Sequence, residues 1–170
     1  FGSIFFIALS VIESGQLVDT MIKRVMIATD GSDTSKKAAV IGIDIARRAN
    51  GTVTAVYVMD ISRLSHLPGY ATLPGLKEKI LALIQDEGRQ AIEFVQDRAQ
   101  VMSVPCNKII AQGNPGEELL KAAREQEADL LVMGKIGRTA VEKFLLGSVA
   151  EKVVLQSTIP VLLIKGDEST

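Results

Sequence analysis

The chain has 170 residues, which suits one domain of ordinary size. Lys and Arg total 19 and Asp and Glu total 20, so the net charge of −1 offers no broad field for binding nucleic acid. One Cys (Cys106) and one His (His66) exclude an internal disulfide and a Cys- or His-cluster metal site, and predict a reducing, cytoplasmic compartment.

The first twenty residues form a segment of their own. Residues 4–12 are the most apolar run in the chain, but they are shorter than the roughly 20 residues that span a bilayer. Neither a basic n-region nor an A-x-A cleavage pattern accompanies them. We expect residues 1–20 to be an added extension outside the core, residues 21–170 to form one domain, and no membrane partner. The alternative is that residues 1–20 add a short strand or helix that docks on a partner.

From residue 22 onward, strand-like and helix-like segments alternate. An apolar strand over 25–28 leads into the turn 30–33, where Ser32 or Asp33 can cap a helix. An Asn-Gly pair ends that helix, and a β-branched strand follows over 52–59. The further elements are expected to be a helix over 77–102, a strand over 107–111, a helix over 117–127, a strand over 130–133, a helix that Ser148 caps and that runs to about Gln156, and a strand over 160–164.

This alternation predicts a parallel sheet with helices on both faces. The fully apolar strands agree, because such strands are buried on both sides. We therefore expect an α/β fold, a doubly wound five-stranded parallel sheet in three α/β/α layers. Ligands of such sheets bind beyond the carboxyl ends of the strands, at the topological switch point.

A glycine-rich element follows the fourth strand. Gly134 and Gly137 stand three positions apart, and Gly147-Ser148 follows after nine further residues. Glycines let backbone N–H groups approach an anion, and a helix that starts at Ser148 would bind phosphate at its N-terminus. The element favours a polyphosphate ligand, with flanking cations at Lys135, Arg138 and Lys143. The plainer alternative is a connection to a capped helix, with these cations on a solvated surface.

Standard catalytic and nucleotide motifs are absent from the sequence. No G-x-x-x-x-G-K-[ST] element occurs, and the first strand is not followed by G-x-G-x-x-G, which argues against a P-loop or a dinucleotide site. No Ser-His-Asp set and no convincing carboxylate pair is present. We expect His66 to be exposed and Cys106 to pack as a small apolar residue. The sequence therefore predicts a binding protein without catalytic or metal-ligating residues.

These segments together resemble the ATP-binding branch of the universal stress protein family. That branch carries G-x-x-G, nine residues and G-[ST], which residues 134–148 match in spacing. The Thr29-Asp30 pair, Asp129 to Gly134 and Pro160 to Leu163 match the family in the same order. The resemblance covers about 22–165 and implies an adenine nucleotide α-hydrolase-like fold with strand order 3-2-1-4-5.

The resemblance also implies an adenine nucleotide between the first and fourth strands. Asp30 would bond the ribose or a metal-bound water, Val58 would meet adenine through its backbone, and residues 147–149 would hold the phosphates. The implied ligand is ATP (or ADP or AMP), with Mg²⁺ or Mn²⁺ carried by its phosphates. The implied contact residues are Ala28, Thr29, Asp30, Val58, Met133, Gly134, Gly137, Arg138, Gly147, Ser148 and Val149.

The resemblance implies a nucleotide-dependent sensor or switch of the stress response with little or no hydrolysis. It further implies a homodimer formed through the last strand, Pro160 to Ile164, and a protein partner that remains unknown. An apolar edge strand supports the dimer independently, because such an edge is prone to pair with another chain. The alternatives are a slow ATPase and a nucleotide-independent dimeric scaffold.

Overall fold

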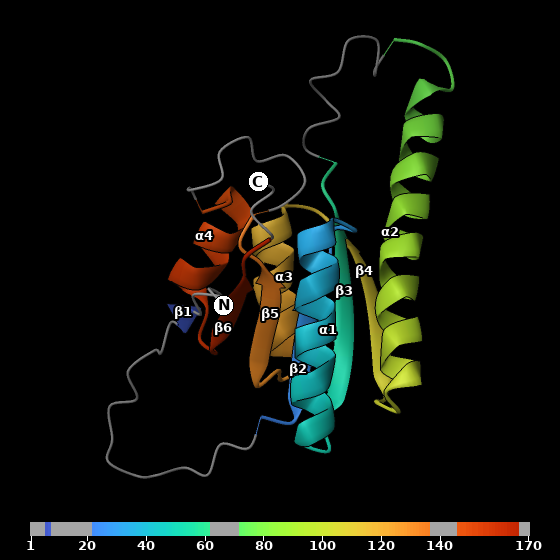
Figure 1. The fold of residues 1–170 in the computed structure, drawn as a ribbon. Coiled ribbons are helices and arrows are strands. Elements are labelled where there is room, and N and C mark those ends of the chain that lie inside the picture. The colour runs from blue at the N-terminus through green and yellow to red at the C-terminus, as the bar shows by residue number, and fades with distance from the viewer. Residues whose placement is uncertain (1–5, 8–21, 62–71, 137–145, 167–170) are drawn as a thin grey trace.

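Six strands form one sheet in the order β1-β6-β5-β2-β3-β4 (Figure 1). The computed structural model describes residues 6–7, 22–61, 72–136 and 146–166. The strands are β1 (Phe6–Ile7), β2 (Arg24–Ala28), β3 (Thr52–Met59), β4 (Cys106–Gln112), β5 (Leu130–Gly134) and β6 (Val161–Ile164). The helices are α1 (Asp33–Arg48), α2 (Leu76–Val101), α3 (Pro115–Glu125) and α4 (Ser148–Gln156).

The five strands from β2 to β6 are parallel to their neighbours. Counted along the chain from β2, their order in the sheet is 3-2-1-4-5, which confirms the predicted fold. The strand β1 is an addition: Phe6 pairs with Leu163 and Ile7 with Leu162, antiparallel to β6. This pairing occupies backbone groups on the outer edge of β6 that would otherwise lack a strand partner.

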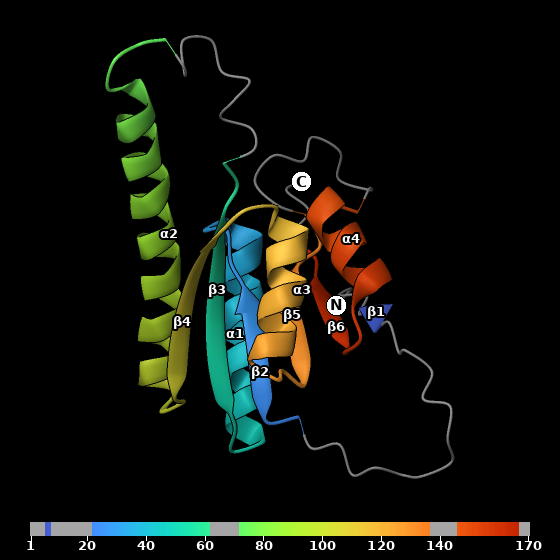
Figure 2. The same ribbon diagram turned by 180° about the vertical axis from the view of Figure 1, so that it is seen from behind.

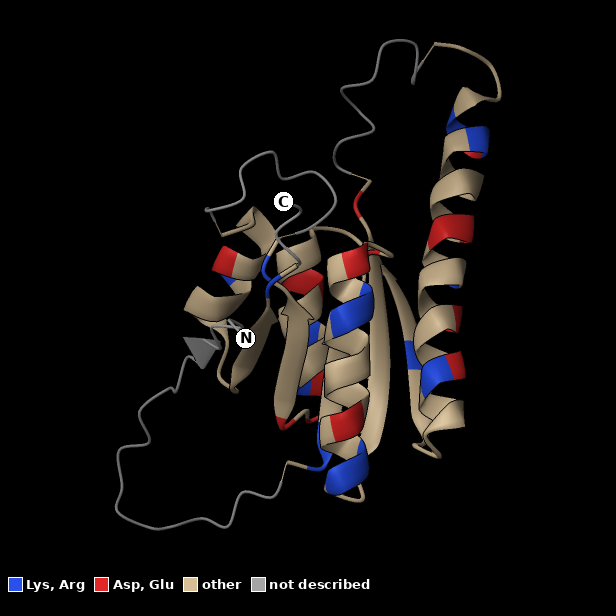
Figure 3. Cartoon of the chain, in the orientation of Figure 1, with Lys and Arg blue, Asp and Glu red and all other residues tan. Residues whose placement is uncertain are grey.

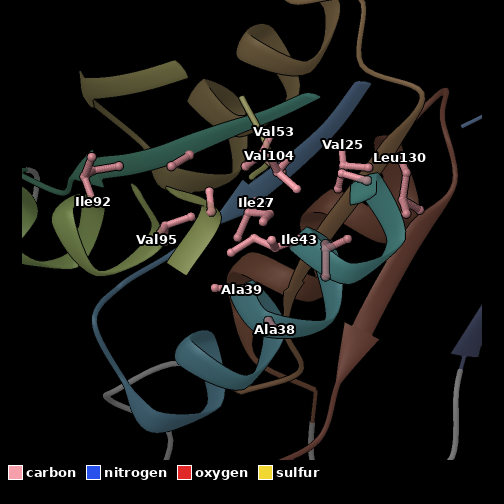
Figure 4. Close-up of a cluster of buried hydrophobic side chains, with 14 of the residues drawn as sticks. Val25, Ile27, Ala38, Ala39, Ile43, Val53, Ile92, Val95, Val104 and Leu130 are labelled. Carbon is pink, nitrogen blue, oxygen red and sulfur yellow. The ribbon is translucent and has the colours of Figure 1, made fainter. Parts of the chain in front are cut away.

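Helices cover both faces of the sheet, so the molecule has three layers (Figures 1 and 2). Alternate residues of the central strands enter two separate apolar clusters. Ile27 and Val132 pack with α1 and α2, whereas Met26 and Leu131 pack with α3 and α4. Figure 4 shows Ile27 beside Ile43 of α1, with Val95 of α2 in the same cluster. Charges of both signs lie on the helices, and the central strands are nearly free of them (Figure 3). No helix in the described part of the chain is long and apolar enough to cross a bilayer.

Gly88 explains how closely the long helix α2 approaches the sheet. A Cβ atom at this position would lie 2.6 Å from Cδ1 of Tyr57, on the neighbouring strand β3. Tyr57 is 7% exposed and its ring fills the space under the helix. The glycine is thus required by packing, although glycine lowers intrinsic helix stability by up to about 1 kcal/mol relative to alanine.

Asp129 joins β2 and β5 at the amino end of the sheet. Its Oδ2 accepts hydrogen bonds from the backbone N–H groups of Lys23 (3.0 Å) and Arg24 (2.8 Å). Its Oδ1 lies 3.1 Å from the Arg24 guanidinium, which also pairs with Glu127 at 2.7 Å. Burial opposes ionisation, but the bonds from Arg24 and Lys23 outweigh it and lower the pKa of Asp129. The contacts fix these strands at the end opposite the switch point.

Cys106, the first residue of β4, is half-buried against the cluster under α1 and α2. Burial raises the pKa of its thiol, against the opposing effect of a backbone hydrogen bond from Ala55. A raised pKa disfavours the reactive thiolate. The side chain therefore packs as an apolar residue, as the sequence predicts.

Candidate functional site

The neighbouring strands β2 and β5 mark the topological switch point of the sheet. The chain leaves β2 through α1 on one face and leaves β5 through α4 on the other. Their register runs from Val25 opposite Leu130 to Ile27 opposite Val132. Residues 28–30 and 133–135 therefore follow at the same carboxyl edge, which is where ligands of doubly wound sheets bind.

Thr29 ties the end of β2 to the start of α1. It is 6% exposed, and its N–H donates to the carbonyl of Val56 at 2.9 Å. Its hydroxyl lies 3.2 Å from the hydroxyl of Ser35 and accepts from the N–H of Gly31 at 3.3 Å. Gly31 has a φ of 77°, a conformation that glycine adopts without strain. The Thr29 side chain thus stabilises the turn between β2 and α1 by hydrogen bonds within it.

Asp30 is oriented by the cap of α1. Its Oδ1 accepts from the N–H of Ser32 at 3.0 Å and from the Ser32 hydroxyl at 2.6 Å. The same hydroxyl oxygen accepts from the N–H of Ser35 at 3.2 Å, so Ser32 is the N-cap residue. Of the two predicted caps, Ser32 is correct and Asp33 is the first helical residue. A half-buried carboxylate is thereby held at the switch point.

The site has two arms: the segment after β2, described above, and the glycine element over residues 134–148. The described part of the second arm brings the two ends of the glycine element together. The N–H of Gly147 donates to the carbonyl of Lys135 at 3.0 Å, and the N–H of Lys135 donates to the carbonyl of Ile164 at 2.7 Å. Gly134 lies against α1, since a Cβ on it would sit 3.0 Å from Cγ2 of Thr34. The N-terminus of α4 is therefore fixed beside the carboxyl end of β5.

The start of α4 differs from the prediction that Ser148 caps it. Gly147 is the N-cap residue, with φ −65° and ψ 145°, and Ser148 is the exposed first residue of the helix. No side chain from the described residues caps α4, whereas Ser32 caps α1 and Asn114 caps α3. The first turn of α4 thus has the backbone donors and dipole that favour an anion.

The other predicted contact residues lie around these two arms. Ala28 and Met133 are 8% and 6% exposed and belong to the cluster on the α3 and α4 face. Val58 and Val149 are half-buried beside the same cluster. Gly137, Arg138 and Lys143 lie outside the described residues. Nothing among the described residues groups three or more potential metal ligands.

Lys152 is a residue that the sequence analysis missed. Its Nζ lies 2.7 Å from Oε1 of Glu117 and 3.4 Å from Oδ1 of Asn114, both in the first turn of α3. The only sequence signal is the Asn-x-x-Glu spacing from Asn114 to Glu117, which is typical of a capping box and does not indicate a lysine.

Known proteins resemble this chain over nearly its whole length. Universal stress protein MJ0531 of Methanocaldococcus jannaschii is 37% identical over 161 residues, covering 95% of this chain and 91% of that protein. Protein MJ0577 of the same organism has a structure of TM-score 0.72 and 25% identity, with coverage of 88% and 99%. A universal stress protein solved in complex with cAMP has a TM-score of 0.61 and 26% identity, with coverage of 85% and 98%. The sequence model of the universal stress protein family matches residues 21–165, and the chain belongs to that family.

Proposed function

We propose that the chain binds an adenine nucleotide at the switch point between β2 and β5 and acts as an ATP-dependent sensor or switch. One observation carries the proposal. No side chain from the part of the chain that the structure describes caps the N-terminus of α4, and the bond from Gly147 to Lys135 holds this end against β5. Phosphate groups bind such helix ends through free N–H groups and the helix dipole.

The two arms divide the nucleotide between them. The segment after β2 takes the nucleoside, with Asp30 bonding the ribose or a metal-bound water and the backbone of Val58 meeting adenine. The arm after β5 takes the phosphates. The proposed contact residues are Ala28, Thr29, Asp30, Val58, Met133, Gly134, Gly137, Arg138, Gly147, Ser148 and Val149. Mg²⁺ or Mn²⁺ is held by phosphate oxygens and water.

The structural relative in complex with cAMP supports an adenine nucleotide as the ligand class. The choice of ATP rests on the sequence of residues 134–148, which matches the ATP-binding branch of the family. We propose no catalytic residue, because the sequence has no Ser-His-Asp set and no convincing carboxylate pair to activate water for attack on the γ-phosphate.

The direct test is to denature the purified protein and identify the released nucleotide by chromatography and mass spectrometry. Near-stoichiometric ATP supports tight binding with very slow turnover. ADP alone, with phosphate release that a Ser148→Ala variant abolishes, would instead favour the slow ATPase. No released nucleotide, together with no change in melting temperature in excess Mg-ATP, contradicts the proposal, because a ligand that binds only the folded state raises stability.

A charge at the start of α4 separates binding from folding. Ser148→Asp places a carboxylate at the first helical residue, where the dipole favours it by about 0.3–1 kcal/mol. We expect the melting temperature to hold or rise while calorimetry shows at least about a tenfold loss of ATP affinity, equal to about 1.4 kcal/mol. The matched control is Lys77→Gln, which makes the same change of one charge unit in the first turn of α2. Within the described ranges no side chain caps α2, and this helix lies on the far side of the molecule from α4 (Figure 1). The control should bind normally.

We also propose a homodimer through the edge of β6. The strand is wholly apolar, and its outer edge is paired with β1 over two residues. A second copy can pair along this edge once Phe6 and Ile7 leave it. This arrangement makes dimer formation compete with an intramolecular contact.

A further inference from the structure

An ion pair joins α3 to α4 near the start of α4, the end that is proposed to hold phosphate. The ammonium of Lys152 lies 2.7 Å from Glu117 and 3.4 Å from the side-chain oxygen of Asn114. Other ion pairs of the described residues link neighbours within one helix or surround Arg24 at the amino edge of the sheet. The pair of Lys152 and Glu117 connects two helices.

The lysine side chain follows a defined path across α3. A Cβ atom on Gly116 would lie 2.8 Å from Cδ and 3.1 Å from Cγ of Lys152. The aliphatic part of the lysine therefore packs on the glycine backbone, and the side chain is only 29% exposed. Any larger residue than glycine would displace it.

Lys152 lies within one turn of the helix end that would hold phosphate. It stands four residues after Ser148, on the same face of α4 and about 6 Å further along the axis. Side chains of a helix tilt toward its N-terminus, so the lysine extends in the direction of that end. An anion bound at the start of α4 would lie on the side toward which the lysine extends.

We propose that Lys152 is the residue that distinguishes nucleoside di- and triphosphates from monophosphates at this site, an inference that rests on the proposed function. In the free protein Glu117 and Asn114 hold the ammonium. A polyphosphate carries more charge than one carboxylate and takes the ammonium from Glu117, whose side chain is 65% exposed and easily hydrated. A monophosphate competes less well. The released Glu117 is placed to turn back to the backbone of Asn114, as in a capping box.

The test compares ATP and AMP affinities by calorimetry in two variants with opposite expected effects. Lys152→Gln should weaken ATP binding about tenfold and AMP binding less than about threefold, because the lost charge acts mainly on the outer phosphates. Glu117→Gln should strengthen ATP binding about threefold, since the lysine no longer has a competing carboxylate. Lys121→Gln removes an equal charge from an exposed position of α3 and should change neither affinity.

The outcomes distinguish this inference from the proposed function. If the parent protein binds neither ATP nor AMP, both fail. If the parent binds ATP and Lys152→Gln leaves the ratio of ATP to AMP affinity unchanged, only the role of Lys152 fails. If both variants weaken ATP and AMP alike, the pair merely positions α4, and the specificity role is again overturned. Circular dichroism checks that each variant is folded.

Discussion

Asp129 shows how a single carboxylate sets the register of the central strands. In Asp129→Ala, two backbone N–H groups lose their partner and the Arg24 guanidinium keeps only Glu127. We expect a loss of about 1–3 kcal/mol in the free energy of unfolding, measured in urea. Glu127→Ala is the control, since its 75% exposed carboxylate pairs with the same arginine and should contribute under about 1 kcal/mol. Equal losses in the two variants would contradict this assignment.

The same residue predicts part of the acid sensitivity of the protein. The pKa of Asp129 is lower in the folded state than its ordinary value of about 3.9. Its contribution is therefore complete above that value and is lost as the pH falls through the folded-state pKa. The stability of Asp129→Asn should fall less steeply than that of the parent protein between neutral and strongly acid pH. Parallel profiles of the two proteins would show that Asp129 contributes nothing to this dependence.

Gly88→Ala tests the contact between α2 and β3. Helix propensity alone would favour alanine by up to about 1 kcal/mol. The added methyl would meet the Tyr57 ring, however, at a calculated 2.6 Å. We expect a net loss of about 1–3 kcal/mol in urea unfolding. The loss should shrink in a Tyr57→Leu background, and additive effects of the two substitutions would contradict a direct clash.

At the scale of single residues, the sequence shows which residue stands at each position but not which residues of other elements it contacts. Gly88 is visible in the sequence only as a weak point of a predicted helix. Its partner Tyr57 lies on a different element, so tertiary packing decides its role. Lys152 is hidden in the same way, because Glu117 and Asn114 belong to another helix.

At the scale of elements, the start of α1 links helix stability to the candidate site. Ser32→Ala removes the cap and the hydroxyl that bonds Asp30. The cap loss should lower stability by about 1 kcal/mol. Asp30 keeps the bond from the N–H of Ser32 but loses the one from its hydroxyl, and this looser hold should weaken nucleotide binding. Ser32→Gly is the matched variant: glycine is a nearly equivalent cap but also lacks the hydroxyl. Affinity should fall equally in both variants while stability falls mainly in Ser32→Ala. Normal affinity in both would show that the Ser32 hydroxyl does not orient Asp30 for binding.

The helices and strands themselves are largely predictable from local chemistry. The helix expected over 77–102 is found at 76–101, and the Asn-Gly stop and the cap at Ser32 are confirmed. The start of α4 is not predictable in the same way. Ser148 is a good capping residue, but Gly147 takes the extended cap conformation because its N–H is bonded to Lys135. A tertiary contact thus moves the helix start by one residue.

At the scale of the whole molecule, alternation and apolar strands suffice to predict the doubly wound sheet. They do not predict β1, because two residues carry no periodic signal and their place depends on the edge left by β6. The position of the candidate site follows from the topology, since the switch point lies between β2 and β5. The proposed phosphate site depends on the backbone donors of α4, which the sequence shows only as a glycine spacing.

The edge contact of β1 leads to a prediction about assembly. A variant without residues 1–20 loses the partner of Leu162 and Leu163 and presents the β6 edge to a second copy. We expect light scattering after size-exclusion chromatography to show dimer at lower protein concentration than for the full chain. The matched control lacks only residues 1–5 and keeps Phe6 and Ile7, so it should behave like the full chain. If both truncated chains stay monomeric and folded at every concentration, the β6 edge is not a dimer interface. If both behave alike as dimers, the segment 6–7 does not compete for the edge.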